Sequence, residues 1–239
     1  KENKYDDDIF FQKYSQMSRS QQGLAGAGEW ETLRKLLPDF KDKRVLDLGC
    51  GYGWHCIYAM EHGASSVVGV DISHKMLEVA KEKTHFPQVE YKCCAIEDVE
   101  FPEESFDVIL SSLAFHYVAD YEILVKKIYR ILKSGGKLVF TVEHPVFTAY
   151  GTQDWYYNEK GEILHFPVDN YYYEGKRTAV FLGEKVTKFH RTLTTYLNTL
   201  LSNGFIINHI VEPQPPEYMM DIPGMRDEMR RPMMLIVSA

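Results

Sequence analysis

The chain has 239 residues, enough to bury one sizeable core, and we expect a single α/β domain that carries an insertion. Its hydrophobic content of 45% and charged content of 26% are ordinary for a soluble globular protein. The net charge of -7 argues against nonspecific nucleic-acid binding, which needs a basic surface to displace counterions. No apolar run is long enough to cross a membrane, no signal peptide is recognisable, and none of the cysteines forms a C-x-x-C pair. We therefore expect a cytoplasmic protein with reduced thiols.

The N-terminal two thirds of the chain are predicted to be helical first and then to alternate between strands and helices. Residues 1–40 are expected to form a helical cap, in which Trp30 and Leu33 repeat at helical spacing before Pro38 stops the run. Beyond it we predict strands over 44–48, 66–70, 89–93, 106–110 and 137–142, and helices over 54–62, 75–83 and 121–132. Such alternation predicts a buried parallel sheet with right-handed crossovers.

The alternation stops after Pro145. Residues 146–190 are rich in aromatic side chains, and glycines punctuate them as turn residues would. We interpret this stretch as an inserted β-rich lid or substrate segment. A helix over 193–201 and two strands over 205–211 and 234–237 are then predicted to close the chain.

An apolar strand leads into a glycine-rich turn and then a helix start over residues 45–54, whose sequence is Val-Leu-Asp-Leu-Gly-Cys-Gly-Tyr-Gly-Trp. Glycines let a ligand lie against bare backbone, and a helix start offers unpaired N–H groups. A dinucleotide site usually has the pattern G-x-G-x-x-G, whose third glycine lets helix and strand pack closely. Here Trp54 occupies that third position, so the turn favours a nucleoside cofactor other than NAD.

Together with residues 71–77, Asp-Ile-Ser-His-Lys-Met-Leu, this turn resembles the class I S-adenosylmethionine (SAM)-dependent methyltransferases, closest in character to the quinone-biosynthesis group. The resemblance covers most of the chain. It implies a three-layer Rossmann-like sandwich with a mostly parallel seven-stranded sheet, an antiparallel last strand and a β-rich insertion after strand five. It also implies one domain over 1–239, SAM as cofactor, S-adenosylhomocysteine as product, and no metal.

An acid at the end of the second strand is the main predicted cofactor contact. Asp71 lies about 20 residues beyond the glycine turn, where a carboxylate can accept hydrogen bonds from both ribose hydroxyls, in SAM and NAD sites alike. Asp47 is expected to orient the ammonium of SAM, while Gly49, Cys50 and Gly51 offer backbone approach. The resemblance extends the predicted cofactor site to Tyr14, Arg19, Ile72, Met76, Ala95, Ile96, Glu97, Ser111 and Leu113.

Some of these positions carry an alternative interpretation. Ala95 departs from the family pattern, which often has an Asp near the adenine, and leaves that role to the backbone of Ile96 or to Glu97. Arg19 is either a partner for the SAM carboxylate or a solvated surface arginine. Met76 is either a cofactor contact or plain core.

Methyl transfer from a sulfonium is an in-line displacement, which positioning accelerates and which needs a general base only when the acceptor must lose a proton. His116 and His144, which follow the fourth and fifth predicted strands, are candidate bases and acceptor contacts because histidine titrates near neutral pH. Tyr171, in the aromatic insertion, and His190 complete the candidate acceptor site. For His190, structural anchoring of the lid is the alternative.

The leading interpretation is therefore a SAM-dependent methyltransferase (EC 2.1.1.-) acting on an O, N or C atom of a small molecule. An NAD-dependent oxidoreductase is the first alternative, disfavoured by Trp54 and the closing antiparallel strands. A non-catalytic SAM-binding module and an RNA or protein methyltransferase are the others. The acidity and the lack of an Asn-Pro-Pro-Tyr/Phe signature argue against the last of these. We expect a monomer or homodimer, with no nucleic-acid partner and no membrane span.

Overall fold

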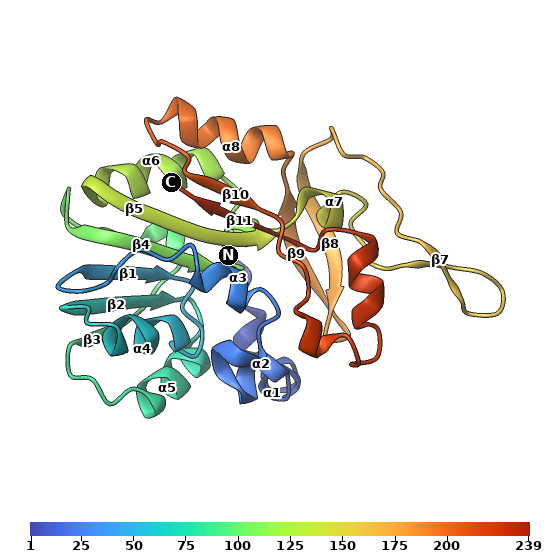
Figure 1. Ribbon diagram of the computed structural model, residues 1–239, viewed down its shortest axis with the longest axis horizontal. Helices are drawn as coiled ribbons and strands as arrows, with labels where there is room; N and C mark the ends of the chain where they lie inside the picture. The colour runs from blue at the N-terminus through green and yellow to red at the C-terminus, as the bar shows by residue number, and fades with distance from the viewer.

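The computed structural model describes residues 1–239 and is built on one central sheet (Figure 1). Its seven strands have the order β10-β11-β5-β4-β1-β2-β3. The pairs β4–β5, β1–β4, β1–β2 and β2–β3 are parallel, whereas β11 runs antiparallel to both β5 and β10. The predicted Rossmann-like fold with a mostly parallel sheet and an antiparallel last strand is confirmed.

The elements of the central layers follow the predicted alternation. The strands are β1 (Arg44–Leu48), β2 (Ser66–Asp71), β3 (Val89–Cys93), β4 (Phe106–Ser112), β5 (Leu132–Glu143), β10 (His209–Val211) and β11 (Met234–Ser238). The main helices are α4 (Trp54–Glu61), α5 (His74–Lys83), α6 (Tyr121–Ile131) and α8 (Leu193–Ser202). In Figure 1, α4 and α5 cover one face of the sheet and α6 and α8 cover the other.

Each face of the sheet buries its own core because successive strand side chains point to opposite faces. Val45 and Val67 join the cluster under α4, while Leu46 and Val68 join the larger cluster under α6 and α8. Parallel strands buried on both faces read as continuous apolar runs, which is why the sequence showed them clearly.

Two predicted boundaries were wrong. The sequence predicted a helix over 121–132 and a strand only from residue 137, with the glycines at 135 and 136 between them, but α6 ends at Ile131 and β5 begins at Leu132. Leu132 already pairs with Phe106 of β4, and the register shifts between Phe106 and Val108, so the glycines are absorbed into an irregular strand start. The strand predicted over 205–211 is shorter, because β10 begins only at His209.

The remaining elements gather beyond the carboxyl ends of the parallel strands. The N-terminal segment forms η1 (Lys4–Asp6), α1 (Asp8–Ser15), α2 (Ser18–Gln21), η2 (Gly23–Gly26) and α3 (Trp30–Arg34). The insertion contains α7 (Pro145–Thr148), β6 (Tyr156–Tyr157), β7 (Ile163–His165), β8 (Gly175–Phe181) and β9 (Glu184–His190). Short turns complete the chain: η3 (Ile96–Asp98), η4 (Phe115–Tyr117), η5 (Glu217–Met219) and η6 (Met225–Arg230).

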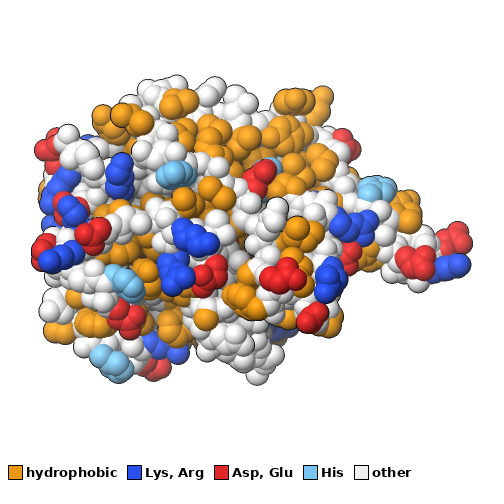
Figure 2. All heavy atoms as spheres, in the orientation of Figure 1, with side chains coloured by type: hydrophobic (Ala, Val, Ile, Leu, Met, Phe, Trp, Pro, Cys, Tyr) orange, Lys and Arg blue, Asp and Glu red, His pale blue; other side chains and the backbone are white.

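The N-terminal segment and the insertion contact each other. Phe10 of α1 forms a small buried cluster with Ala179 of β8 and Val186 of β9. Lys13 donates a hydrogen bond of 3.0 Å to the carbonyl of Leu182 in the turn between these strands. The β6–β7 hairpin instead projects from the body, and charged side chains gather at its tip (Figure 2). No helix in the structure is both long and apolar enough to span a bilayer.

Candidate cofactor and acceptor site

A cavity of about 820 Å³ opens where the parallel strands end. Its floor comes from the residues that follow β1, β2, β3 and β4, and its other walls come from the N-terminal segment and from β9. Ligands of open α/β sheets bind outside the carboxyl ends of the strands, and this volume lies in the upper part of the usual range of about 300–1,000 Å³ for small-molecule sites. The cavity therefore has the place and the size of a functional site.

The glycine turn presents bare backbone to this cavity. Gly49 and Gly51 both have a positive φ, 78° and 52°. A Cβ at Gly49 would approach the Cβ of Ala114 to 2.4 Å, whereas a Cβ at Gly51 would meet no protein atom within 4 Å. Both residues line the cavity. The open space beside Gly51 fits a ligand that packs against the backbone, as SAM would.

Asp71 stands at the end of β2 with its carboxylate held by backbone amides. Oδ2 accepts a hydrogen bond of 2.9 Å from the N–H of Gly51, and Oδ1 accepts one of 2.9 Å from the N–H of Ser73. Burial raises the pKa of Asp71, although these backbone hydrogen bonds oppose it. Each carboxylate oxygen keeps lone-pair capacity for a further donor. The donor set fits a ribose diol.

Most of the predicted cofactor residues are brought together here. All of them except Asp47, Cys50 and Ser111 line the large cavity: Tyr14, Arg19, Gly49, Gly51, Asp71, Ile72, Met76, Ala95, Ile96, Glu97 and Leu113. Ser111 is buried beside the cavity floor, where its hydroxyl donates a hydrogen bond of 2.7 Å to the carbonyl of Leu48 and joins the ends of β4 and β1.

Asp47 lies away from the cavity, between β1 and α4. Its Oδ2 is 3.5 Å from the Sγ of Cys56, which donates to it, and its Oδ1 has no partner. Burial raises the pKa of Asp47 to about 7. The carboxyl therefore points toward α4 and does not line the cavity.

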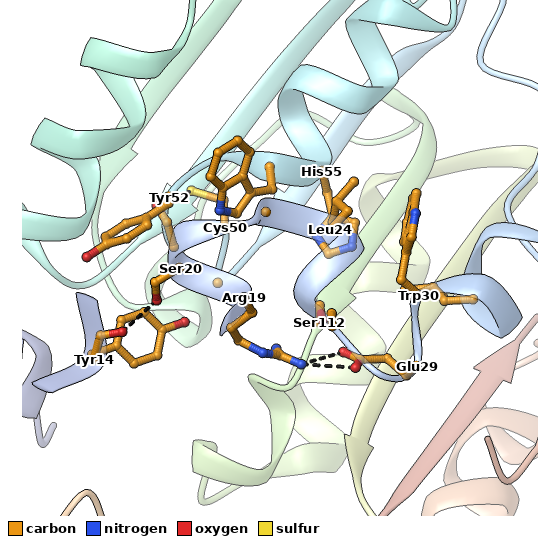
Figure 3. A pocket seen from close by; sticks show the side chains of 16 residues that line it. Tyr14, Arg19, Ser20, Leu24, Glu29, Trp30, Cys50, Tyr52, His55 and Ser112 are labelled. Carbon is orange, nitrogen blue, oxygen red and sulfur yellow. Dashed lines mark hydrogen bonds and ion pairs between the residues drawn. The ribbon is translucent and has the colours of Figure 1, made fainter. Parts of the chain in front are cut away.

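A second cavity of about 70 Å³ lies beside the turn and shares Tyr14, Arg19, Gly49, Gly51 and Ser112 with the first (Figure 3). Cys50 lines only this smaller cavity. The guanidinium of Arg19 donates to both carboxylate oxygens of the buried Glu29, over 2.7 and 3.0 Å. Figure 3 shows this ion pair below the turn. Arg19 is thus only partly exposed and is paired with a protein carboxylate. One nitrogen, Nη2, makes both of these hydrogen bonds, and the other guanidinium N–H groups take no part in them.

His116 and His144 occupy different surroundings although each follows a predicted parallel strand. His116, in η4, is buried and lines the cavity, and its Nδ1 accepts a hydrogen bond of 3.3 Å from the backbone N–H of Glu143. His144 caps α7 by accepting from the N–H of Val146 at 3.0 Å, and its Nε2 lies 2.8 Å from Oε1 of Glu212. His144 lines neither cavity.

Tyr171 and His190 join the insertion to α8 and also lie outside the lining of both cavities. Nε2 of His190 donates to the carbonyl of Tyr171 over 2.9 Å, and its Nδ1 lies 2.7 Å from the hydroxyl of Thr148. The hydroxyl of Tyr171 accepts a hydrogen bond of 3.2 Å from the N–H of Leu193. With both ring nitrogens engaged, His190 has the surroundings of a structural anchor.

Two charged residues at the β9 end of the cavity were not predicted. Lys188 and Glu143 both line it, and the Nζ of Lys188 lies 2.5 Å from Oε1 of Glu143. A signal existed in the sequence: in β9 the buried residues alternate as Val186, Lys188 and His190, so the lysine stands at an inward position. A lysine at such a position is rarely buried unless it is paired.

Comparison with known proteins agrees with this geometry. The family described as "Methyltransferase domain" matches residues 46–140. A crystal structure described as a candidate SAM-dependent methyltransferase from Listeria monocytogenes is 57% identical, with a TM-score of 0.87 over 90% of this chain and 97% of its own. A SAM-dependent methyltransferase from Mesorhizobium loti is 40% identical, with a TM-score of 0.83 over 90% and 99%.

A ubiquinone biosynthesis O-methyltransferase of Coxiella burnetii is 36% identical over 46% of this chain and 47% of its own length. The structures from Listeria monocytogenes and Mesorhizobium loti each match 90% of this chain, whereas the Coxiella burnetii protein matches about half of it. The glycine turn, the strand order and these similarities lead to one family. The chain belongs to the class I SAM-dependent methyltransferases, whose methyl donor is S-adenosylmethionine.

Proposed function

We propose that this protein transfers a methyl group from SAM to a small molecule that binds at the β9 end of the large cavity. The observation that carries the proposal is that the candidate cofactor residues and the candidate acceptor residues line one cavity. Gly51 and Asp71 line the same cavity as His116 and Lys188. A donor and an acceptor can therefore be held side by side, and positioning of this kind provides much of the acceleration of a displacement reaction.

The proposed roles at the cofactor end follow from the contacts described above. Asp71 would accept hydrogen bonds from the ribose, and the backbone of Gly49 and Gly51 would pass beside the methionine part. Met76 and Ile96, both buried and both in the cavity wall, would flank the adenine. Bound SAM supplies an electrophilic methyl group. The N-terminal segment and β9 would exclude water from it, since they cover the ends of the strands.

At the acceptor end we propose His116 as a contact residue. His144, Tyr171 and His190 are not assigned to the acceptor site, because none of them lines the cavity. Relatives that match about half of this chain include both an O-methyltransferase and an N-methyltransferase, so the acceptor atom follows from the chemistry of the site rather than from similarity.

The proposal is tested first by binding and then by turnover. Calorimetry is expected to show binding of SAM and S-adenosylhomocysteine and no comparable binding of NAD. A screen of hydroxylated small molecules, read by release of S-adenosylhomocysteine, is then expected to identify acceptors. Tight NAD binding would contradict the assignment. Binding of SAM with no release of product for any acceptor would favour a non-catalytic SAM-binding module.

A further inference from the structure

A buried ion network closes the acceptor end of the cavity. Lys188 is only 3% exposed, and its Nζ lies 2.5 Å from Oε1 of Glu143 and 2.8 Å from Oε1 of Gln153. The side-chain amide of Gln153 donates to the other oxygen of Glu143 over 2.5 Å. Both carboxylate oxygens are therefore engaged, whereas the ammonium has three N–H donors and uses two.

His116 presents an N–H to the cavity. The backbone N–H of Glu143 is directed at Nδ1, and an amide N–H can only donate. Nδ1 must therefore keep its lone pair, which places the single proton of the neutral ring on Nε2. Burial lowers the pKa of His116 to about 4, so the ring is neutral at pH 7. No other hydrogen bond involves this ring, which leaves the Nε2–H free to donate.

More cationic than anionic side chains face His116. Lys188 and Arg191 face the ring as cations, and Glu143 faces it as the one anion. Arg191 is buried and forms no ion pair. Its guanidinium donates instead to the carbonyls of Phe115, Val118 and Ala119. The other charged residues lining this end are exposed or half-buried and include both signs: Glu2, Lys4 and Lys176.

No group at this end is suited to take a proton from the acceptor. His116 offers a donor there. For Glu143, burial by itself raises the pKa, but the charges of His116 and Lys188 and the hydrogen bonds from Lys188 and Gln153 outweigh it and lower the pKa. Since His116 is neutral at pH 7, Lys188 is the partner that matters there. Burial also raises the pKa of the Tyr117 hydroxyl, so it stays protonated. A nucleophile that carries a hydroxyl or thiol must therefore arrive already ionised.

The wall around these donors is aromatic and apolar. Phe181 and Phe189 of the β8–β9 hairpin line it together with Val186. Tyr5 of the N-terminal segment and Tyr117 of η4 also line it, and their hydroxyls meet at 3.4 Å. A flat ring buries its faces well against such a wall.

We propose that the acceptor is an aryloxide, an aromatic ring whose ionised oxygen faces the Nε2–H of His116 and the ammonium of Lys188. The inference rests on the proposed methyl transfer. The hydroxyl proton leaves to solvent before the reaction. The aryloxide oxygen then bonds to the methyl carbon while the C–S bond breaks, and the electron pair of that bond stays on sulfur. The products are an aryl methyl ether and a neutral thioether.

The probe for this site is 4-nitrophenol, because only its ionised form absorbs strongly in visible light. With the protein saturated by S-adenosylhomocysteine, we expect the ionised form to bind about 10-fold or more tightly than the neutral form, since a cation within about 4–6 Å favours the anion. The absorbance of the bound probe then changes at a lower pH than that of the free probe. Equal binding of the two forms would overturn the inference. Tighter binding of 4-nitrobenzoate would overturn it too, because the site would then select a carboxylate.

Two substitutions separate a donor from a base. His116→Gln keeps an N–H donor but has no basic nitrogen, so it is expected to keep most of the preference for the anion. His116→Leu removes the donor and is expected to lose about 10-fold. If both variants bind the probe as the unchanged protein does, the role of His116 is wrong. Lys188→Met, checked for folding by thermal melting, is expected to move the absorbance curve back toward that of the free probe.

The two proposals fail in different ways. A protein that binds no S-adenosylhomocysteine would contradict the methyltransferase function itself. A protein that binds it normally but shows no preference for the phenolate would contradict only the aryloxide site.

Discussion

Asp71 at the end of β2 accepts a hydrogen bond of 2.9 Å from the backbone N–H of Gly51 in the turn that follows β1. The carboxylate thereby fixes the conformation of the turn whose backbone would meet the cofactor. Its second oxygen is held by Ser73, whose hydroxyl caps α5 by accepting from the N–H of Met76. The turn, the acid and the helix start therefore form one preorganised unit, and preorganisation lowers the entropy cost of binding.

Removing the charge of Asp71 should weaken cofactor binding. Asp71→Asn is expected to cost about 1–3 kcal/mol of S-adenosylhomocysteine affinity, as the loss of hydrogen bonds to a charged group does. Isothermal calorimetry measures this change. Glu90→Gln, at an exposed position of the neighbouring strand β3, is the matched control and should bind normally. Unchanged affinity in Asp71→Asn would remove the residue from the site.

The two glycines of the turn should respond differently to alanine. Both have a positive φ, which costs an L-residue about 1–2 kcal/mol. In Gly49→Ala the new methyl group also clashes with Ala114, so stability should fall further. In Gly51→Ala the methyl group meets no protein atom and enters the ligand space, so affinity should fall more than stability. Thermal melting and calorimetry on both variants test this contrast, and the reverse order would contradict it.

Breaking the Lys188–Glu143 pair should destabilise the protein strongly. Lys188→Met or Glu143→Gln leaves an unpaired buried charge, for which about 3–5 kcal/mol is typical. The double variant should recover part of the loss, because neither charge is then left alone. Denaturant unfolding measures all three variants. Lys126→Met breaks the exposed pair with Glu122 and serves as control, with a much smaller expected loss. Strictly additive losses would contradict the coupling.

Asp47 should make stability fall as the pH rises. Burial raises its folded-state pKa from 3.8 to about 7, so the folded state holds the proton more tightly and loses stability as the pH rises through this interval. Asp47→Asn removes the effect. The unfolding free energy of the variant relative to the unchanged protein should therefore rise by about 2–3 kcal/mol between about pH 5 and about pH 8.5. The exposed Glu82→Gln is the control. A difference that does not depend on pH would contradict the burial of this acid.

The same Asp47→Asn protein distinguishes the structural position from the ammonium contact expected for that residue. A carboxyl that points toward Cys56 should have little influence on the affinity for S-adenosylhomocysteine. A loss of affinity as large as that expected for Asp71→Asn would show instead that Asp47 contacts the ammonium.

The fold and the cofactor end were accessible from sequence because their signals are local. The apolar run of each strand is contiguous in sequence, and Gly51 of the turn and Asp71 at the end of β2 are 20 residues apart. Side-chain direction within such an element was harder to predict. Asp47 and Gly49 belong to one motif, yet Asp47 lies on the α4 side of β1, the side it shares with Val45, because alternate strand residues face the same side.

The acceptor end depends on contacts between distant parts of the chain. Lys188 and Glu143 are 45 residues apart, and His116 is 27 residues from Glu143. His116 and His144 follow parallel strands in the same way, and only the docking of the insertion and the N-terminal segment decides which of them faces the cavity. The sequence by itself determined the family and the glycine turn, because helix and strand periodicity and backbone constraints act over short distances. The tertiary structure alone decided the tautomer of His116 and the buried ion network, since both arise from groups that meet only when the sheet, η4 and β9 pack together.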